Sequence, residues 1–140
     1  MFKRILAAND GSEGGKKALL VAINLARKFE AELHCISVKE RPRHYAATVG
    51  EVMEEQEEVD KFFAKVISES KELAKQQGVY LECTVLAGHE VEIIIKFARE
   101  RQVDLLVIGF MGHSRAFGRI WGGTSQNLTK TSPCSVLVVK

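Results

Sequence analysis

Hydrophobic residues recur along the chain with two different spacings. Segments with apolar side chains at three- and four-residue steps are typical of helices that bury one stripe, and short apolar runs between turn-forming residues are typical of strands. The two kinds of segment alternate along the whole chain. The predicted strands are residues 2–8, 33–38, 79–86, 104–108 and 135–139, and the predicted helices are residues 16–29, 51–77, 89–101 and 123–130.

Strands that alternate with helices predict an α/β fold, an open parallel sheet with helices on both faces. The chain has 140 residues, enough for one domain with a substantial core, and no linker, repeat or low-complexity segment divides residues 1–140. The periodicity also predicts which side chains of the three longer helices face the sheet. They are Leu19, Ala22, Ile23, Ala26 and Phe29 in the first, Val59, Phe62, Phe63, Val66, Ile67 and Leu73 in the second, and Val91, Ile94, Ile95 and Ala98 in the third.

Composition and charge exclude several classes of partner. The formal net charge of +2 is too close to neutral to favour nucleic acid as the main partner. No run approaches the roughly 20 apolar residues of a membrane span, and Met1 leads directly into a strand-like segment rather than a signal peptide. We therefore expect a cytoplasmic protein without a membrane partner.

The cysteines and histidines give no sign of a metal site. Cys35, Cys83 and Cys134 are odd in number and lack a CxxC spacing, which argues against a disulfide framework or a zinc site. We expect buried, reduced thiols. The histidines lack metal-ligand spacing, so no metal ligands are predicted within the chain.

The most unusual stretch is the connection at residues 109–125, between the fourth strand and the last helix. It holds five glycines, two arginines and three hydroxyl side chains, and it is far longer than an ordinary connection. Glycines let main-chain N–H groups approach a ligand closely, and a helix start offers unpaired donors. This composition favours binding of a phosphate group.

A second loop of turn-forming residues, 9–15, follows the first strand. In open parallel sheets, ligands bind beyond the carboxyl ends of the strands, where the strand order reverses. If the first and fourth strands are neighbours there, both loops face one crevice. Asp10 could then accept hydrogen bonds from ribose hydroxyls, and the main-chain amides of residues 109–125 could bind phosphates. Neither a P-loop string, GxxxxGK[ST], nor a dinucleotide GxGxxG string occurs at these positions.

Three motifs in order resemble the universal stress protein family. Gly109-Phe110-Met111-Gly112, nine further residues and Gly122 match the family's Gly-x2-Gly-x9-Gly spacing. The opening string Ile5-Leu6-Ala7-Ala8-Asn9-Asp10-Gly11-Ser12 resembles the family's first strand and its Asp-Gly-Ser turn. The ending Ser132-Pro133-Cys134-Ser135-Val136-Leu137-Val138-Val139 resembles its usual close, so the likeness covers essentially the whole chain.

The resemblance implies a Rossmann-like sheet of five parallel strands in the order 3-2-1-4-5, with an adenine nucleotide at its carboxyl edge. It implies that Asp10 faces the ribose or adenine, that Val38 lines the adenine pocket, and that three glycines shape the phosphate loop. Arg115 and His113 are candidate phosphate contacts. The expected binding residues are Ala8, Asn9, Asp10, Val38, Gly109, Gly112, His113, Arg115, Gly122, Gly123, Thr124 and Ser125.

One position departs from the family's pattern. Gly123 stands where the motif carries Ser or Thr, although Thr124 and Ser125 follow. Loss of one hydroxyl removes about 1 kcal/mol of hydrogen bonding, while main-chain amides and the helix dipole remain. We expect weakened or rearranged binding, with a protein that binds no nucleotide as the alternative.

The expected function is a nucleotide-binding regulator of the stress response that switches through the glycine-rich loop. The expected ligand is ATP, or else ADP or AMP, with Mg²⁺ as an optional companion. One alternative is an interaction module of the same family that binds no nucleotide. The other is an ATP hydrolase, whose turnover should be slow because no general base is identified. The final apolar strand, with no helix after it, should form a sheet edge, and the resemblance implies a homodimer through it.

Overall fold

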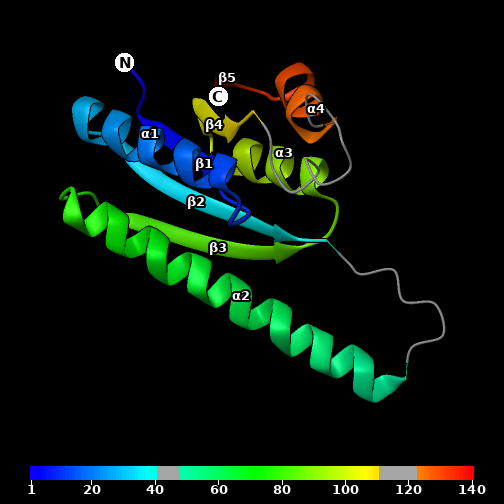
Figure 1. The fold of residues 1–140 in the computed structure, drawn as a ribbon. Coiled ribbons are helices and arrows are strands. Elements are labelled where there is room, and N and C mark those ends of the chain that lie inside the picture. The colour runs from blue at the N-terminus through cyan, green and yellow to red at the C-terminus, as the bar shows by residue number, and fades with distance from the viewer. Residues whose placement is uncertain (41–47, 111–122) are drawn as a thin grey trace.

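The computed structural model describes residues 1–40, 48–110 and 123–140, and all nine predicted elements are found within them (Figure 1). Most ends differ from the predicted ones by one to three residues. The elements are β1 (Arg4–Ala8), α1 (Glu13–Phe29), β2 (Glu32–Lys39), α2 (Val49–Gln76), β3 (Leu81–Ala87), α3 (Glu90–Glu100), β4 (Leu105–Gly109), α4 (Gly123–Thr131) and β5 (Ser135–Val139).

The five strands form one parallel sheet in the order β3-β2-β1-β4-β5, which confirms the expected topology. β1 lies at the centre and pairs with β2 on one side and β4 on the other. The direction of the chain across the sheet therefore reverses between β1 and β4, so the carboxyl ends of these two strands, where the two predicted binding loops begin, lie next to each other. β5 is an edge strand, as predicted, and β3 is the other edge.

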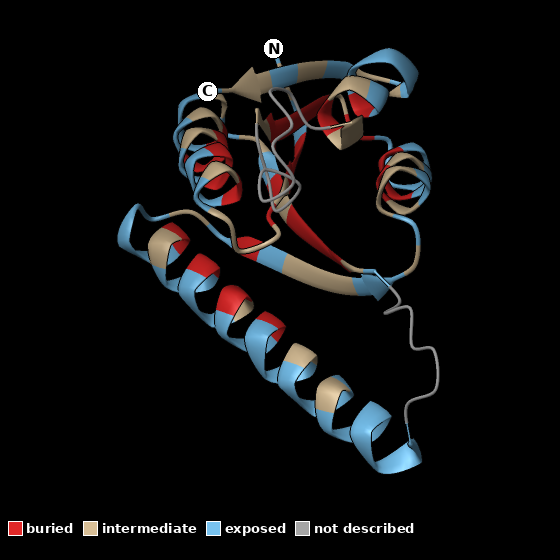
Figure 2. Ribbon diagram, turned by 45° about the vertical axis from the view of Figure 1, so that its right-hand side comes forward, coloured by how far each residue is buried: buried red, intermediate tan, exposed pale blue. Residues whose placement is uncertain are grey.

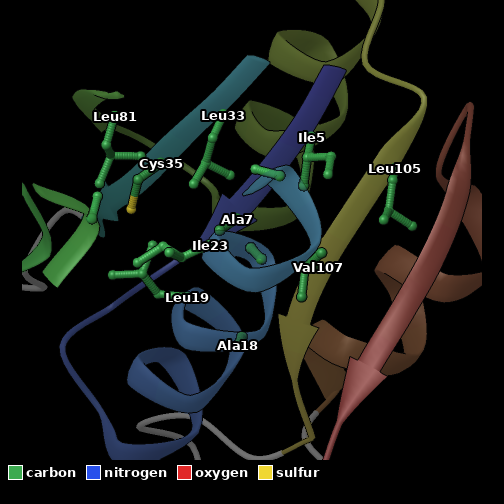
Figure 3. Packing of buried hydrophobic residues seen from close by; sticks show 13 residues of the cluster. Ile5, Ala7, Ala18, Leu19, Ile23, Leu33, Cys35, Leu81, Leu105 and Val107 are labelled. Carbon is green, nitrogen blue, oxygen red and sulfur yellow. The ribbon is translucent and has the colours of Figure 1, made fainter. Parts of the chain in front are cut away.

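Alternate strand residues point into two separate hydrophobic cores. Ile5 and Ala7 of β1 pack with Ala18, Leu19 and other residues beneath α1 and α2 (Figure 3). Their neighbour Leu6 packs on the opposite face, beneath α3 and α4. Helices thus cover both faces, as predicted, and the strands read as nearly continuous apolar runs because both sides are buried.

α1 begins at Glu13, three residues before the predicted start. Ser12 is its N-cap, and the Ser12 hydroxyl accepts a hydrogen bond of 3.1 Å from the Gly15 N–H. The glycines at 14 and 15 are typical of turns, which is why the pattern places them in a loop. Here an added Cβ at Gly15 would lie 2.7 Å from Asn9 Oδ1, so the glycine lets the first helical turn approach the end of β1.

α2 is longer than the sheet that it covers, and the prediction that all six apolar residues of its inner stripe face the sheet is wrong for one of them. Phe63 and Val66 are buried, but Phe62 is 42% exposed. The amino-terminal half of α2 extends past β2 and β3 and is mostly exposed (Figure 2). The helix begins with a capping box between Thr48 and Glu51. Burial of this helix is therefore limited by the length of the strands, which helical periodicity does not report.

Two further expectations can be compared with the described residues. All three cysteines are free thiols; Cys35 is buried, whereas Cys83 and Cys134 are only partly so. In the described ranges, every helix is too short or too polar to cross a lipid bilayer.

Candidate functional site

Eight of the twelve predicted binding residues lie in the described part of the chain, around the carboxyl ends of β1, β2 and β4. They are Ala8, Asn9, Asp10, Val38, Gly109, Gly123, Thr124 and Ser125. Gly112, His113, Arg115 and Gly122 lie outside the described residues. The carboxyl edge of the sheet and the beginning of α4 therefore make up the part of the candidate site that can be analysed.

Asp10 occupies the turn between β1 and α1. Its Oδ1 accepts a hydrogen bond of 2.9 Å from the Ser12 N–H and a second one from the Ser12 hydroxyl. Gly11, at φ +85°, allows the chain to turn sharply between them. The turn holds the half-buried Asp10 carboxylate in one orientation at the end of β1.

Asn9 has a structural role in the same turn. It is only 3% exposed, its Nδ2 donates to Ser70 Oγ on α2 at 3.1 Å, and its Oδ1 accepts from the Gly11 N–H at 3.0 Å. The Asn9 carbonyl also accepts a 2.6 Å hydrogen bond from the Ser37 hydroxyl of β2. The Asn9 side chain therefore holds the Asp10 turn against α2, and its main chain holds the turn against β2.

Gly109 and Ser125 connect the end of β4 to two helices. A Cβ added at Gly109 would lie 2.7 Å from the carbonyl carbon of Gly14 in α1, so this position has room only for glycine. The Ser125 hydroxyl is buried and donates a 2.8 Å hydrogen bond to the Gly109 carbonyl. The Ser125 hydroxyl is therefore already used within the protein, where it ties the start of α4 to the end of β4.

Ala8 and Val38 form an apolar surface beneath the site. Both belong to the core beneath α3 and α4, together with Ile36 and Ile108 near the ends of their strands. Val38 is 9% exposed, and Ala8 is partly buried. An apolar surface at the carboxyl edge, bordered by polar groups of neighbouring elements, is typical of a site for a flat organic group.

Glu90, the first residue of α3, is a site residue that sequence analysis missed. Its carboxylate accepts a hydrogen bond from the Thr124 side chain, and it lies near the carboxylates of Asp10 and Glu40. Burial, the largest cause, and the charges of Asp10 and Glu40 together raise the pKa of Glu90 to about 7, whereas the Thr124 hydrogen bond acts in the opposite direction.

No sequence signal distinguishes Glu90 from an ordinary acidic residue. An acid in the first turn of a helix is common because it interacts favourably with the helix dipole. Only the packing of α3 against α4 and β2 reveals that this acid is turned inward. A carboxyl group with a strongly shifted pKa in a crevice is a candidate functional group.

The site thus offers three kinds of contact. The apolar surface suits a ring, the carboxylates at 10, 40 and 90 suit hydroxyl or amino donors, and the α4 start with Thr124 suits an anion. Among residues 1–40, 48–110 and 123–140, no group of three or more His, Cys, Asp or Glu side chains is placed to hold a metal ion.

Comparison with known proteins gives a consistent result. The model of the universal stress protein family matches residues 1–140. Universal stress protein YxiE of Bacillus subtilis is 32% identical over 154 residues, an alignment that covers all of both chains.

Solved structures share the fold. Universal stress protein UspA from Lactobacillus plantarum superposes with a TM-score of 0.89 at 20% identity, covering 99% of this chain and 98% of its own. A universal stress protein solved in complex with cAMP has a TM-score of 0.77 at 25% identity, covering 99% and 97%. The motifs, the strand order and the full-length family match agree, and the chain belongs to the universal stress protein family.

Proposed function

We propose that this protein binds an adenine nucleotide at the carboxyl edge of its sheet and acts as a regulator of the stress response. One observation carries the proposal: Asp10, Thr124 and the apolar pair Ala8 and Val38 come from four different segments yet gather at the carboxyl edge of the sheet. A related structure, 25% identical, holds cAMP, which supports an adenine nucleotide as the ligand.

The proposed arrangement assigns a part of the nucleotide to each group. Adenine lies over Ala8 and Val38, the ribose hydroxyls donate to the Asp10 carboxylate, and the phosphate lies at the start of α4 beside Thr124. Gly112, His113, Arg115 and Gly122 belong to the proposed phosphate loop on sequence grounds alone. ATP is the expected ligand, and Mg²⁺, if it takes part, would draw most of its ligands from phosphate oxygens and water.

We further propose that the protein works in the cytoplasm as one domain of residues 1–140 and forms a homodimer through β5. Two observations support the dimer: β5 is an edge strand, and its Leu137 is 36% exposed. An edge strand with apolar side chains is suited to pairing with a second chain.

The experiment is calorimetric titration of ATP, with and without Mg²⁺, into protein stripped of any nucleotide that purifies with it. Asp10→Asn is the test variant because its amide oxygen still accepts the Ser12 N–H, while the negative charge is lost. Glu100→Gln, at the exposed far end of α3, is the matched control. We expect affinity to fall about ten- to a hundredfold in Asp10→Asn, since a hydrogen bond to a charged acceptor contributes about 1.5–3 kcal/mol, and to remain unchanged in the control.

One observation favours a second function, an interaction module that binds no nucleotide. Glu90 already occupies the Thr124 hydroxyl, and it adds negative charge where a phosphate would lie. Absorbance near 260 nm after denaturation of freshly purified protein separates the two functions. Released adenine nucleotide supports the first, while its absence together with no heat at millimolar ATP supports the second.

A further inference from the structure

Two of the three cysteines face each other across neighbouring strands, away from the nucleotide crevice. Cys35 of β2 is paired in register with Cys83 of β3. Directly opposed residues on neighbouring strands are about 4.8 Å apart, and disulfides join Cα atoms about 4.4–6.8 Å apart. A disulfide between them therefore needs only a small adjustment, and β3, as an edge strand, is restrained on one side alone.

The two thiols differ in their access to solvent. Cys35 is 2% exposed and belongs to the core beneath α1 and α2, where Figure 3 shows it beside Leu81. Cys83 packs against the same core but is partly exposed, and it lines a groove of about 660 Å³. A small oxidant in solvent can therefore reach Cys83 directly, whereas Cys35 is shielded from solvent.

The surroundings of Cys83 favour its thiolate. The thiol of Cys35 hydrogen-bonds to the Cys83 sulfur and lowers its pKa, burial acts in the opposite direction, and the charge of Lys71 lowers the pKa further. The same hydrogen bond, together with burial, raises the pKa of Cys35 well above its usual range. The thiolate is the reactive form of cysteine, so the pair consists of a reactive sulfur in a groove and a protonated sulfur behind it.

We propose that Cys83 and Cys35 form a peroxide-sensitive thiol pair that closes to a disulfide between β2 and β3. The Cys83 thiolate attacks a hydroperoxide; an S–O bond forms, the O–O bond breaks, and the leaving oxygen takes a proton to become water or an alcohol. Cys83 is thereby oxidised to a sulfenic acid. The Cys35 sulfur then attacks Cys83, an S–S bond forms, and the sulfenic oxygen leaves as water with the proton from Cys35.

This proposal does not depend on the proposed nucleotide site. The overall change consumes two thiols and one hydroperoxide and gives one disulfide, one water and one further water or alcohol. The product lies inside the fold, so it would not link two copies of the chain. Reduction by a small dithiol restores the starting state.

The test treats the full chain with hydrogen peroxide and reads the product by intact mass and by mass spectrometry of peptides prepared without reduction. In the wild-type protein we expect the loss of two hydrogens and a peptide pair linked through Cys35 and Cys83. The Cys35→Ser variant should instead accumulate a sulfenic acid on Cys83 that a dimedone probe captures, and Cys83→Ser should give neither product. Cys134→Ser is the control: it removes the third thiol, which is partly buried, and should behave like the wild type.

Lys71→Met tests the effect of the Lys71 charge on Cys83. It should slow the attack of the Cys83 thiolate on the hydroperoxide without changing the disulfide product. Circular dichroism confirms that the serine variants, which replace sulfur by the slightly smaller oxygen, remain folded. Oxidation first at Cys134, a disulfide between two chains, or a dimedone adduct on Cys83 in the wild type with no linked peptide would each overturn the proposal.

Discussion

Replacement of Glu90 by Gln should make the protein more stable at alkaline pH. Glu90 is inward-facing at the start of α3, near the carboxylates of Asp10 and Glu40. Gln keeps an oxygen that can accept the Thr124 hydrogen bond and has nearly the same volume. The substitution therefore removes the charge of residue 90 and leaves its main contact in place.

The magnitude follows from the pKa of Glu90, which burial and the two neighbouring carboxylates raise from 4.5 to about 7. The folded state then holds its proton more tightly than the unfolded state. Between pH 4.5 and 7 the unfolded state binds fewer protons, so the free energy of unfolding decreases as pH rises and levels off above pH 7. At about 1.4 kcal/mol per pH unit, the full loss is about 3 kcal/mol.

The assay is urea denaturation of wild type and Glu90→Gln at pH 4.5, 6, 7 and 8. The two proteins should have similar free energies of unfolding at pH 4.5, and the variant should be more stable by up to about 3 kcal/mol at pH 8. Glu92→Gln, an exposed acid in the same helical turn, is the control and should show no such trend. A difference between Glu90→Gln and wild type that is the same at all four pH values would refute the assignment of Glu90 as an inward-facing acid.

Three further results are expected. Binding of cAMP, whose charge is constant over this range, should be tighter at pH 6 than at pH 8 by up to about tenfold, because ionised Glu90 repels the phosphate. Calorimetry should find no such pH dependence of cAMP affinity in Glu90→Gln. The same pH dependence in both proteins would contradict the assigned effect of Glu90. Gly109→Ala should lower the free energy of unfolding by about 1–3 kcal/mol in urea, because its Cβ would meet Gly14 at 2.7 Å; an unchanged midpoint would show that α1 shifts freely. Leu137→Lys should convert a dimer to a monomer in light scattering, whereas Leu86→Lys, equally exposed at 36% on the opposite edge strand, should not; a dimer that survives Leu137→Lys would exclude the β5 interface.

Much of the fold could be predicted from the sequence because periodicity reports burial directly. The alternation of apolar runs and amphipathic stripes located all nine elements, and the motifs around Asp10 and Gly109 led to the strand order through the family resemblance. The errors occur where tertiary structure overrides local pattern. Gly14 and Gly15 belong to α1 because the helix must approach β1 and β4 closely. Phe62 has helical spacing, yet it is partly exposed, because its ring lies over the turn at Gly11 rather than over the sheet.

Most of the predicted site residues that the structure describes lie at one edge of the sheet, but the contacts of each residue could not be predicted from the sequence. The motif groups Asn9 with Asp10, although the Asn9 side chain hydrogen-bonds to Ser70 and to the main chain of the turn. Glu90 belongs to no sequence motif. Its shifted pKa arises where α3 packs beside α4 and where Glu90 meets Thr124, a residue 34 positions away in the chain. Hydrogen-bond partners and desolvation depend on the assembled structure, so composition and spacing do not report them.

The central claim is that the carboxyl edge of the sheet receives an adenine nucleotide. The most direct measurement is a titration of ATP into isotope-labelled protein, followed through the amide resonances of the whole chain. We expect shifts at Gly11, Val38 and Thr124, with no shifts at Tyr80 and Arg101, which lie near the opposite, amino ends of the strands. Shifts confined to the opposite edge, or none at millimolar ATP, would contradict it.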